Sequence, residues 1–200
     1  WGNTVWTSFQ LAALTFFMIF MLFNIYWEMR DFWQLRWHRV ELHNVISKNY
    51  QIPVKWNTEL KYNILGGTLW TRQDSSLKGP LILYIYGFSD DQDSTRYFTI
   101  PIVLAGYDVL TFDTRGKKTS RKVGNKNEFV ETIRDVKDVL EWLLHQPEFQ
   151  HREIIIIGTS LGAISAINTG IQFPEVKKII AISAMSNFRN NFPHSTITFL

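Results

Sequence analysis

The first part of the chain is almost uniformly apolar, without the regular polar positions that a soluble element would have. Residues 1–27 contain no Asp, Glu, Lys or Arg, and the apolar run from Thr4 to Trp27 is 24 residues long. Roughly 20 residues suffice for an α-helix to cross the hydrocarbon core of a bilayer. The pattern therefore predicts an N-terminal transmembrane helix.

Aromatic and apolar residues continue beyond this run. Five of the eight Trp residues lie in the first 37 positions, and Trp rings prefer the interface between water and lipid. From Tyr26 to Val40, apolar residues recur at helical spacing among several Arg residues. We therefore expect the helix to continue along the membrane surface as an amphipathic segment, so that residues 1–49 form a membrane-associated domain.

The apolar run is less typical of a signal peptide or of a buried core helix. A secretory signal peptide has an apolar region of about 7 to 15 residues and a small-residue cleavage site, and neither fits this run. A buried core helix of this length would rarely lack charged residues on every face. Because basic residues follow the span, the positive-inside rule predicts a single-pass protein whose remaining domain is cytoplasmic.

The pattern changes from residue 50 onward. Strand-like segments at 54–57 and 60–64 precede the pair Gly66-Gly67, and another at 68–71 follows it. Alternating apolar residues on both sides of a glycine pair are typical of antiparallel strands joined by a turn. We expect such a hairpin at the start of the second domain.

Farther along, short apolar runs alternate with segments of helical periodicity. The runs are 81–86, 108–112, 153–158 and 177–183, and the helical segments lie near 94–105, 127–145 and 161–172. This alternation is typical of parallel strands that are joined by right-handed helical crossovers and buried on both faces. We predict an α/β fold over residues 50–200, with a mostly parallel sheet and helices on both faces. Pro101 should break or delay its helix, because an interior proline costs about 3 kcal/mol.

Composition and charge narrow the chemistry. The 200-residue chain is 46% apolar and 20% charged, which excludes a disordered protein, and it has no Cys and hence no thiol nucleophile or thiolate zinc site. We expect no metal or cofactor. The basic cluster, which comprises Arg115, Lys117, Lys118, Arg121, Lys122 and Lys126, has no interleaved aromatic residues. We interpret it as a solvated loop and expect no nucleic-acid partner.

The most informative motif is GTSLG, Gly158 to Gly162, at the junction of the third apolar run and the helix after it. A sharp turn from strand to helix lifts the central hydroxyl, that of Ser160, clear of the sheet. Glycines two positions before and after the serine remove side chains that would collide in such a turn. The motif therefore predicts a nucleophile elbow.

Together with two earlier motifs, this elbow resembles the α/β-hydrolase superfamily, particularly its membrane-tethered esterases, lipases and aminopeptidases. YGF at 86–88 resembles HGF after the family's third strand, and DTRGKKTS at 113–120 resembles D-x-R-G-x-G-x-S after its fourth. The resemblance covers about residues 58–190 and implies an α/β-hydrolase fold.

The resemblance also implies roles for individual residues. Ser160 would be the nucleophile, and the backbone N–H groups of Phe88 and Leu161 would form an oxyanion hole, in which each donor is worth about 3 kcal/mol. Asp113 and Arg115 would form a structural ion pair. Tyr86 stands where the family usually has His, and Lys118 stands where it has a second Gly, but neither change removes a backbone donor.

The catalytic base and acid are not evident. In this family the order is Ser, acid and His, but after Ser160 the chain offers only Glu175 and His194. Glu175 precedes the last strand, at the wrong end of the sheet, and His194 comes before the expected histidine loop. We therefore expect the acid and His to lie beyond Leu200; the alternative is a non-catalytic binding or scaffold protein.

The sequence thus predicts a membrane-anchored serine hydrolase that forms an acyl-enzyme on Ser160. Its location favours an ester of a small molecule or an acyl lipid as the substrate and the bilayer as a partner. Peptide hydrolysis stays open, because both reactions pass through the same oxyanion.

Overall fold

The structure is a computed structural model that describes residues 2–38, 42–55, 63–74, 79–125 and 128–184. It divides into two compact units, Trp1–Val40 and Glu41–Leu200. The sequence-based boundary at residue 50 falls inside the first strand, β1 (Val45–Pro53), which pairs with the rest of the sheet.

The first unit is one helix, α1 (Gly2–His38). Its segment Trp6–Met29 has 24 residues and a mean hydropathy of 1.8. The hydroxyl of Thr15 and the amide of Asn24 donate to carbonyl oxygens one turn earlier, at 2.9 and 2.7 Å, so their polar groups are satisfied within the helix. The helix is long and apolar enough to cross a membrane.

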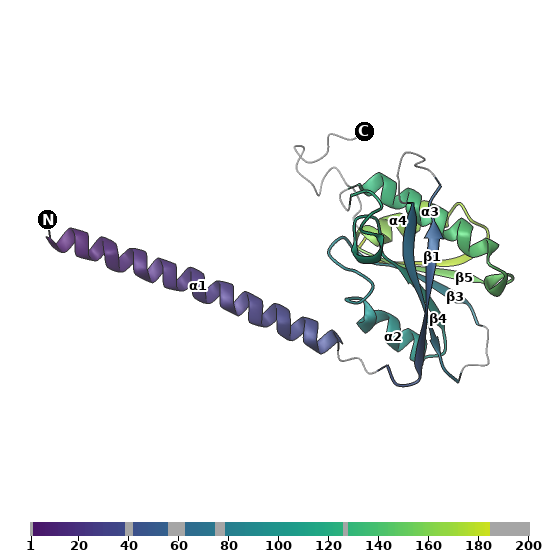
Figure 1. Cartoon of the computed structure of the whole chain (residues 1–200), viewed down its shortest axis with the longest axis horizontal. Coiled ribbons are helices and arrows are strands. Elements are labelled where there is room, and N and C mark those ends of the chain that lie inside the picture. Colours follow the sequence, from purple (N-terminus) through teal and green to yellow (C-terminus); the bar gives the residue numbers. More distant parts are fainter. Residues whose placement is uncertain (1, 39–41, 56–62, 75–78, 126–127, 185–200) are drawn as a thin grey trace. The chain divides into compact units, whose positions relative to one another are not determined.

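The second unit is built on a mixed six-stranded sheet, of which strands β1, β3, β4 and β5 are labelled in Figure 1. After β1 come β2 (Ile64–Arg72), β3 (Leu81–Ile85), β4 (Asp108–Phe112), β5 (Ile154–Thr159) and β6 (Val176–Ile182), and the spatial order is β1-β2-β4-β3-β5-β6. Strands β3 to β6 are parallel to one another, and β2 is antiparallel to both β1 and β4. The predicted mostly parallel α/β sheet is confirmed.

The strand order places a switch point between β3 and β5. The chain passes from β3 to β4 on one side and then returns to β5 on the other side of β3. At such a switch point, the loops that follow the two central strands separate at their carboxyl ends, where open α/β sheets hold their ligands. The segments after β3 and β5 are those that carry Phe88 and Ser160.

Helices cover both faces of the sheet. They are α2 (Arg96–Leu104), α3 (Phe129–His145) and α4 (Leu161–Gly170), with short 3₁₀ turns at Lys118–Ser120 and Pro147–Phe149. Alternate residues of β3 separate the faces: Leu81, Leu83 and Ile85 share a buried cluster with α3 and α4, whereas the ring of Tyr84 stacks on Phe98 of α2. Strand β3 is therefore buried on both of its faces.

The expected turn at Gly66-Gly67 is wrong. Both glycines lie inside β2, opposite Gln51 and Tyr50 of β1. A Cβ atom on Gly66 would lie 2.1 Å from the Thr119 hydroxyl oxygen, and one on Gly67 would lie 2.7 Å from Ile52. Close packing explains these glycines, as it often does for glycine within a strand.

The expected break at Pro101 is also wrong. Helix α2 runs through this residue, and the Pro101 carbonyl accepts a hydrogen bond from the Ala105 N–H at 3.0 Å. Its neighbours Ile100 and Val103 are fully buried against the sheet. Burial of these side chains offsets the one backbone hydrogen bond that the proline removes.

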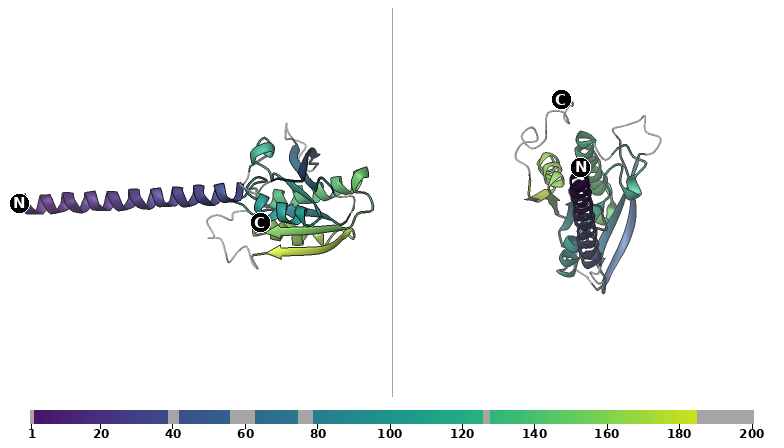
Figure 2. Two further views of the ribbon diagram at one scale, coloured as in Figure 1. Left: turned by 90° about the horizontal axis from the view of Figure 1, so that it is seen from below. Right: turned by 90° about the vertical axis from the view of Figure 1, so that its left-hand side faces the viewer.

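Strand β6 differs from the expectation of burial on both faces. Figure 2 shows β5 and β6 side by side at one end of the sheet. Within the described residues β6 pairs only with β5, and none of its side chains is fully buried: Val176, Ile179 and Ile182 are half-buried and the other four are exposed. The backbone N–H of Ser160 nevertheless donates to the carbonyl of Ile182 at 2.9 Å, which ties the end of β6 to the site.

Candidate active site

Ser160 stands alone between β5, which ends at Thr159, and α4, which begins at Leu161. Its backbone has φ 52° and ψ −116°, a combination that costs a residue with a Cβ atom of order 1 to 3 kcal/mol. The residue is exposed. The serine of GTSLG therefore occupies a strained turn at the carboxyl edge of the sheet, with the amino end of α4 directly behind it.

The two glycines of the motif permit this turn. A Cβ atom on Gly158 would lie 2.4 Å from the carbonyl oxygen of Gly162, and one on Gly162 would lie 2.2 Å from the carbonyl oxygen of Ile85. These neighbours are backbone atoms, which have no rotamer by which to move aside. Only glycine at both positions lets α4 pack this closely on β3 and β5.

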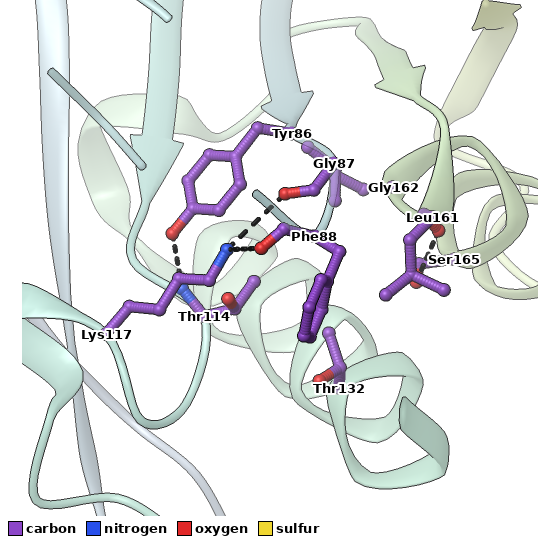
Figure 3. Close-up of a pocket in the computed structure, with 10 residues that line it drawn as sticks. Tyr86, Gly87, Phe88, Thr114, Lys117, Thr132, Leu161, Gly162 and Ser165 are labelled. Atoms are coloured by element: carbon purple, nitrogen blue, oxygen red, sulfur yellow. Dashed lines mark hydrogen bonds between the residues drawn. The ribbon is translucent and has the colours of Figure 1, made fainter. Parts of the chain in front are cut away.

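The turn after β3 lies against Ser160. A Cβ atom on Gly87 would be 3.2 Å from the Cβ atom of Ser160, so no side chain separates the two segments. Figure 3 shows Gly87 and Phe88 facing Leu161 across a cavity of about 10 Å³, roughly the space of one water molecule. The structure thus brings together the three predicted site residues Ser160, Phe88 and Leu161.

Tyr86 secures the start of this turn. Its hydroxyl donates to the carboxylate of Asp113 at 3.2 Å and accepts from the Thr114 N–H at 2.8 Å. Burial raises the pKa of the Tyr86 hydroxyl well above its ordinary value, and the Asp113 charge acts in the same direction. The phenol therefore stays neutral and acts as a hydrogen-bonding link between the loops after β3 and β4.

The expected pair of Asp113 with Arg115 is wrong. Besides Tyr86, Asp113 accepts from the Thr119 hydroxyl at 2.6 Å. Arg115 is fully buried, and its guanidinium donates to Asp135 of α3 at 2.6 and 2.8 Å and to Glu128 at 2.7 Å. The two side chains therefore have different partners: Asp113 bonds within its own loop and to Tyr86 in the turn after β3, whereas Arg115 bonds to α3.

We expect Asp135→Ala to lower the free energy of unfolding by about 3 to 5 kcal/mol, because it leaves the buried Arg115 charge without its main partner. Urea unfolding of the purified protein measures this loss. Glu128→Gln is the matched control, since the Glu128 side chain is 40% exposed and water can replace it; about 1 kcal/mol or less is expected. Equal losses of unfolding free energy in the two variants would contradict the burial of the Arg115–Asp135 pair.

The basic cluster is only in part the solvated loop that the sequence favoured, since Lys118, Arg121 and Lys122 are exposed. Arg115 is buried, Lys117 is half-buried, and Lys118 pairs with Asp91 and Asp93 at 3.0 and 2.6 Å. Lys118 has a positive φ of 29°, which explains why the resembled motif has glycine there. Lys126 lies outside the described residues.

The three described histidines of the second unit lie away from Ser160. His43 precedes β1, His145 ends α3 and His151 precedes β5, so all three are at the amino edge of the parallel strands. Glu175, which directly precedes β6, lies at this edge too, and its carbonyl accepts from the Ile154 N–H at 3.3 Å. His194 lies outside the described residues. In the described part of the chain, no group of three or more His, Asp or Glu side chains is arranged to hold a metal ion.

This fold, with the loops that follow β3, β4 and β5, defines an α/β-hydrolase. The model of the X-Pro dipeptidyl-peptidase (S15) family matches residues 47–197, more than half of the chain. The chain therefore belongs to this family. No curated protein sequence matches it.

Solved structures with the same fold include several hydrolases. A dienelactone hydrolase from Anabaena variabilis has 17% identity and a TM-score of 0.57 over 71% of this chain and 65% of its own. A bacterial heroin esterase has 14% identity and a TM-score of 0.58 over 72% and 44%, respectively. A hyperthermophilic esterase from Pyrobaculum calidifontis has 17% identity and a TM-score of 0.59 over 80% and 50%. The chain thus spans less than two thirds of each of these structures.

Proposed function

We propose that the protein is a membrane-anchored serine hydrolase in which Ser160 attacks the carbonyl carbon of a carboxylic ester. The observation that carries the proposal is the exposed, strained Ser160 at the carboxyl edge of the sheet, with Gly87 directly beside it. Strain of this kind persists only where the surrounding structure enforces it, and it is concentrated at functional sites.

The proposed reaction proceeds in two steps. The Oγ atom of Ser160 forms a bond to the carbonyl carbon, the bond to the alcohol oxygen breaks, and an acyl-enzyme results. A water molecule then attacks the acyl carbon and releases the acid and free Ser160. The backbone N–H groups of Phe88 and Leu161 would stabilise the oxyanion in both steps by about 3 kcal/mol each. Gly158 and Gly162 would keep the elbow in its required shape.

The proton of the Ser160 hydroxyl must pass to a base and then to the leaving group. Since His43, His145 and His151 lie at the amino edge, the proposal assigns the base, and the acid that orients it, to residues outside the described part of the chain.

A second candidate function is peptide hydrolysis by the same serine. The match to the X-Pro dipeptidyl-peptidase family favours it, whereas the names of similar structures, such as heroin esterase, favour an ester. The two substrates differ in their leaving group, an alcohol or an amine, and the acyl-enzyme on Ser160 is common to both.

A substrate panel separates these functions. The full-length protein is assayed with p-nitrophenyl acetate, p-nitrophenyl decanoate and glycyl-prolyl-p-nitroanilide, each beside a Ser160→Ala control. Turnover of the esters alone supports the esterase, with preference for the longer acyl chain supporting a lipid substrate. Turnover of the anilide supports the peptidase. Failure to turn over any of them favours a non-catalytic binding or scaffold protein.

We also propose that α1 anchors the protein, with the bilayer as its partner and the hydrolase domain on the cytoplasmic side. The exposed apolar segment Trp6–Met29 supports this assignment by its length and composition. After extraction of membranes at alkaline pH, the full-length protein should stay in the pellet, and a variant without residues 1–29 should be released. Release of both would contradict the anchor. Protease protection in sealed vesicles tests the sidedness.

A further inference from the structure

The ammonium group of Lys117 lies inside the turn that carries Phe88. Its Nζ atom donates to three backbone carbonyl oxygens, those of Phe88 at 2.5 Å, Asp90 at 2.6 Å and Gly87 at 3.4 Å. Figure 3 shows the bonds to Gly87 and Phe88. The same atom lies 4.8 Å from the centre of the Tyr86 ring, which leaves the cation enclosed by the turn on one side and by an aromatic face on the other.

This contact fixes the direction of a backbone N–H. A trans peptide group points its C=O and its N–H in opposite directions, and the described chain has no cis peptide bond. The Phe88 N–H shares a peptide group with the Gly87 carbonyl. Because that carbonyl faces Lys117, the Phe88 N–H faces away from it.

The side opposite Lys117 is the side of the elbow. In Figure 3, Lys117 and Leu161 lie on opposite sides of the segment Gly87-Phe88, and Gly87 borders Ser160. Lys117 therefore holds the turn with its carbonyls toward the loop after β4 and with the Phe88 N–H toward Ser160.

The turn has other supports among the described contacts. The Asp90 N–H closes the turn by donating to the Gly87 carbonyl at 3.2 Å, and the Phe88 ring contacts Phe129 of α3 edge to face, with ring centres 5.5 Å apart. Of these contacts, only the one with Lys117 brings a full positive charge to three carbonyl dipoles at once. Charge-assisted hydrogen bonds are roughly twice as strong as neutral ones.

We propose that Lys117 is a positioning residue for the oxyanion hole: its ammonium gathers the carbonyls of residues 87–90 so that the Phe88 N–H is fixed toward Ser160 before substrate arrives. This inference rests on the proposed function. Catalytic groups must be held within about 0.5 Å of their productive positions, and loss of one oxyanion donor costs about 10²- to 10³-fold in rate. A loosened donor should therefore cost about 10- to 100-fold.

The test measures the rate at which a fluorophosphonate labels the full-length protein, because the phosphoryl oxygen of the probe occupies the oxyanion hole. Lys117→Cys removes the ammonium, and alkylation with 2-bromoethylamine then restores one at nearly the same reach. The 200-residue sequence has no cysteine of its own, and peptide mapping of the alkylated protein verifies that the introduced thiol is the one modified. Lys122→Met is the matched control, since it removes an exposed charge from the same loop.

Labelling of Lys117→Cys should be about 10- to 100-fold slower than labelling of the wild type, with the loss in the maximal rate rather than in probe affinity. Alkylation should restore most of the rate, and Lys122→Met should label normally. Thermal unfolding followed by circular dichroism verifies that each variant is folded.

Three results would overturn the inference. An unslowed Lys117→Cys variant, or a slowed one that alkylation does not restore, overturns the positioning role while the proposed function stands. A wild-type protein that the probe does not label overturns the proposed function and the inference together.

Discussion

Replacing Ser160 by alanine is expected to lower kcat for the preferred substrate by on the order of 10⁶-fold. The reason is chemical: without the Oγ atom no acyl-enzyme forms, and any residual turnover depends on direct attack by water beside the oxyanion donors. Steady-state kinetics of the purified full-length protein on the preferred substrate of the panel measure the loss.

The structure supplies a control for this comparison. Ser47 lies exposed on β1, the strand at the far edge of the sheet from the elbow, and Ser47→Ala should retain wild-type kcat and KM. If Ser160→Ala kept more than about a tenth of wild-type activity, the assignment of the nucleophile would be wrong.

The second large effect is expected from Gly162→Ala. The added methyl group would lie 2.2 Å from the carbonyl oxygen of Ile85 and 2.6 Å from that of Tyr86. Ile85 is paired with Gly158 in the sheet, so relief requires α4 to move off β3 and to open the turn at Ser160. We expect a loss of about 3 kcal/mol in the free energy of unfolding, together with a loss of serine labelling.

Urea unfolding measures the stability of this variant, and Gly79→Ala is its control. A Cβ atom on Gly79 would meet nothing within 4 Å, so this change should alter stability by about 0.5 kcal/mol or less. Equal stabilities of the two variants would show that the close approach of α4 to β3 is not enforced by Gly162.

The parts of the fold that the sequence predicted are those governed by short-range pattern. Runs such as 81–86 and 153–158 consist almost entirely of apolar side chains because their strands are buried on both faces. The strand formed by the second of these runs ends in the glycine-flanked turn of GTSLG. Both signals are complete within a few consecutive residues, so one sequence is enough to recognise them.

The parts that were missed depend on contacts between distant segments. Gly66 resembles a turn glycine until Thr119, from a loop more than 50 residues away, is packed against it. Likewise, Arg115 has its main partner in Asp135 of α3, and Asp113 is the nearer carboxylate in sequence. Pairing of charges in a buried network follows the geometry of the packed elements, which residue spacing in a loop does not encode.

Lys117 illustrates the same limit at the site itself. In the sequence it is one of six basic residues between positions 115 and 126, and nothing in that pattern separates it from Lys122. Its role depends on the turn after β3 bending back to present three carbonyls to one ammonium. Lys117 can be identified only when the positions of the loops after β3 and β4 relative to each other are known.

The most direct test of the account is to find which atom the fluorophosphonate modifies. The full-length protein is treated with the probe, its intact mass is measured by mass spectrometry, and it is then digested so that the modified residue can be mapped. We expect one phosphonyl group per protein, carried by Ser160. An unmodified Ser160, whether the probe is absent or attached to a different residue, would contradict the claim that this turn presents an active nucleophile.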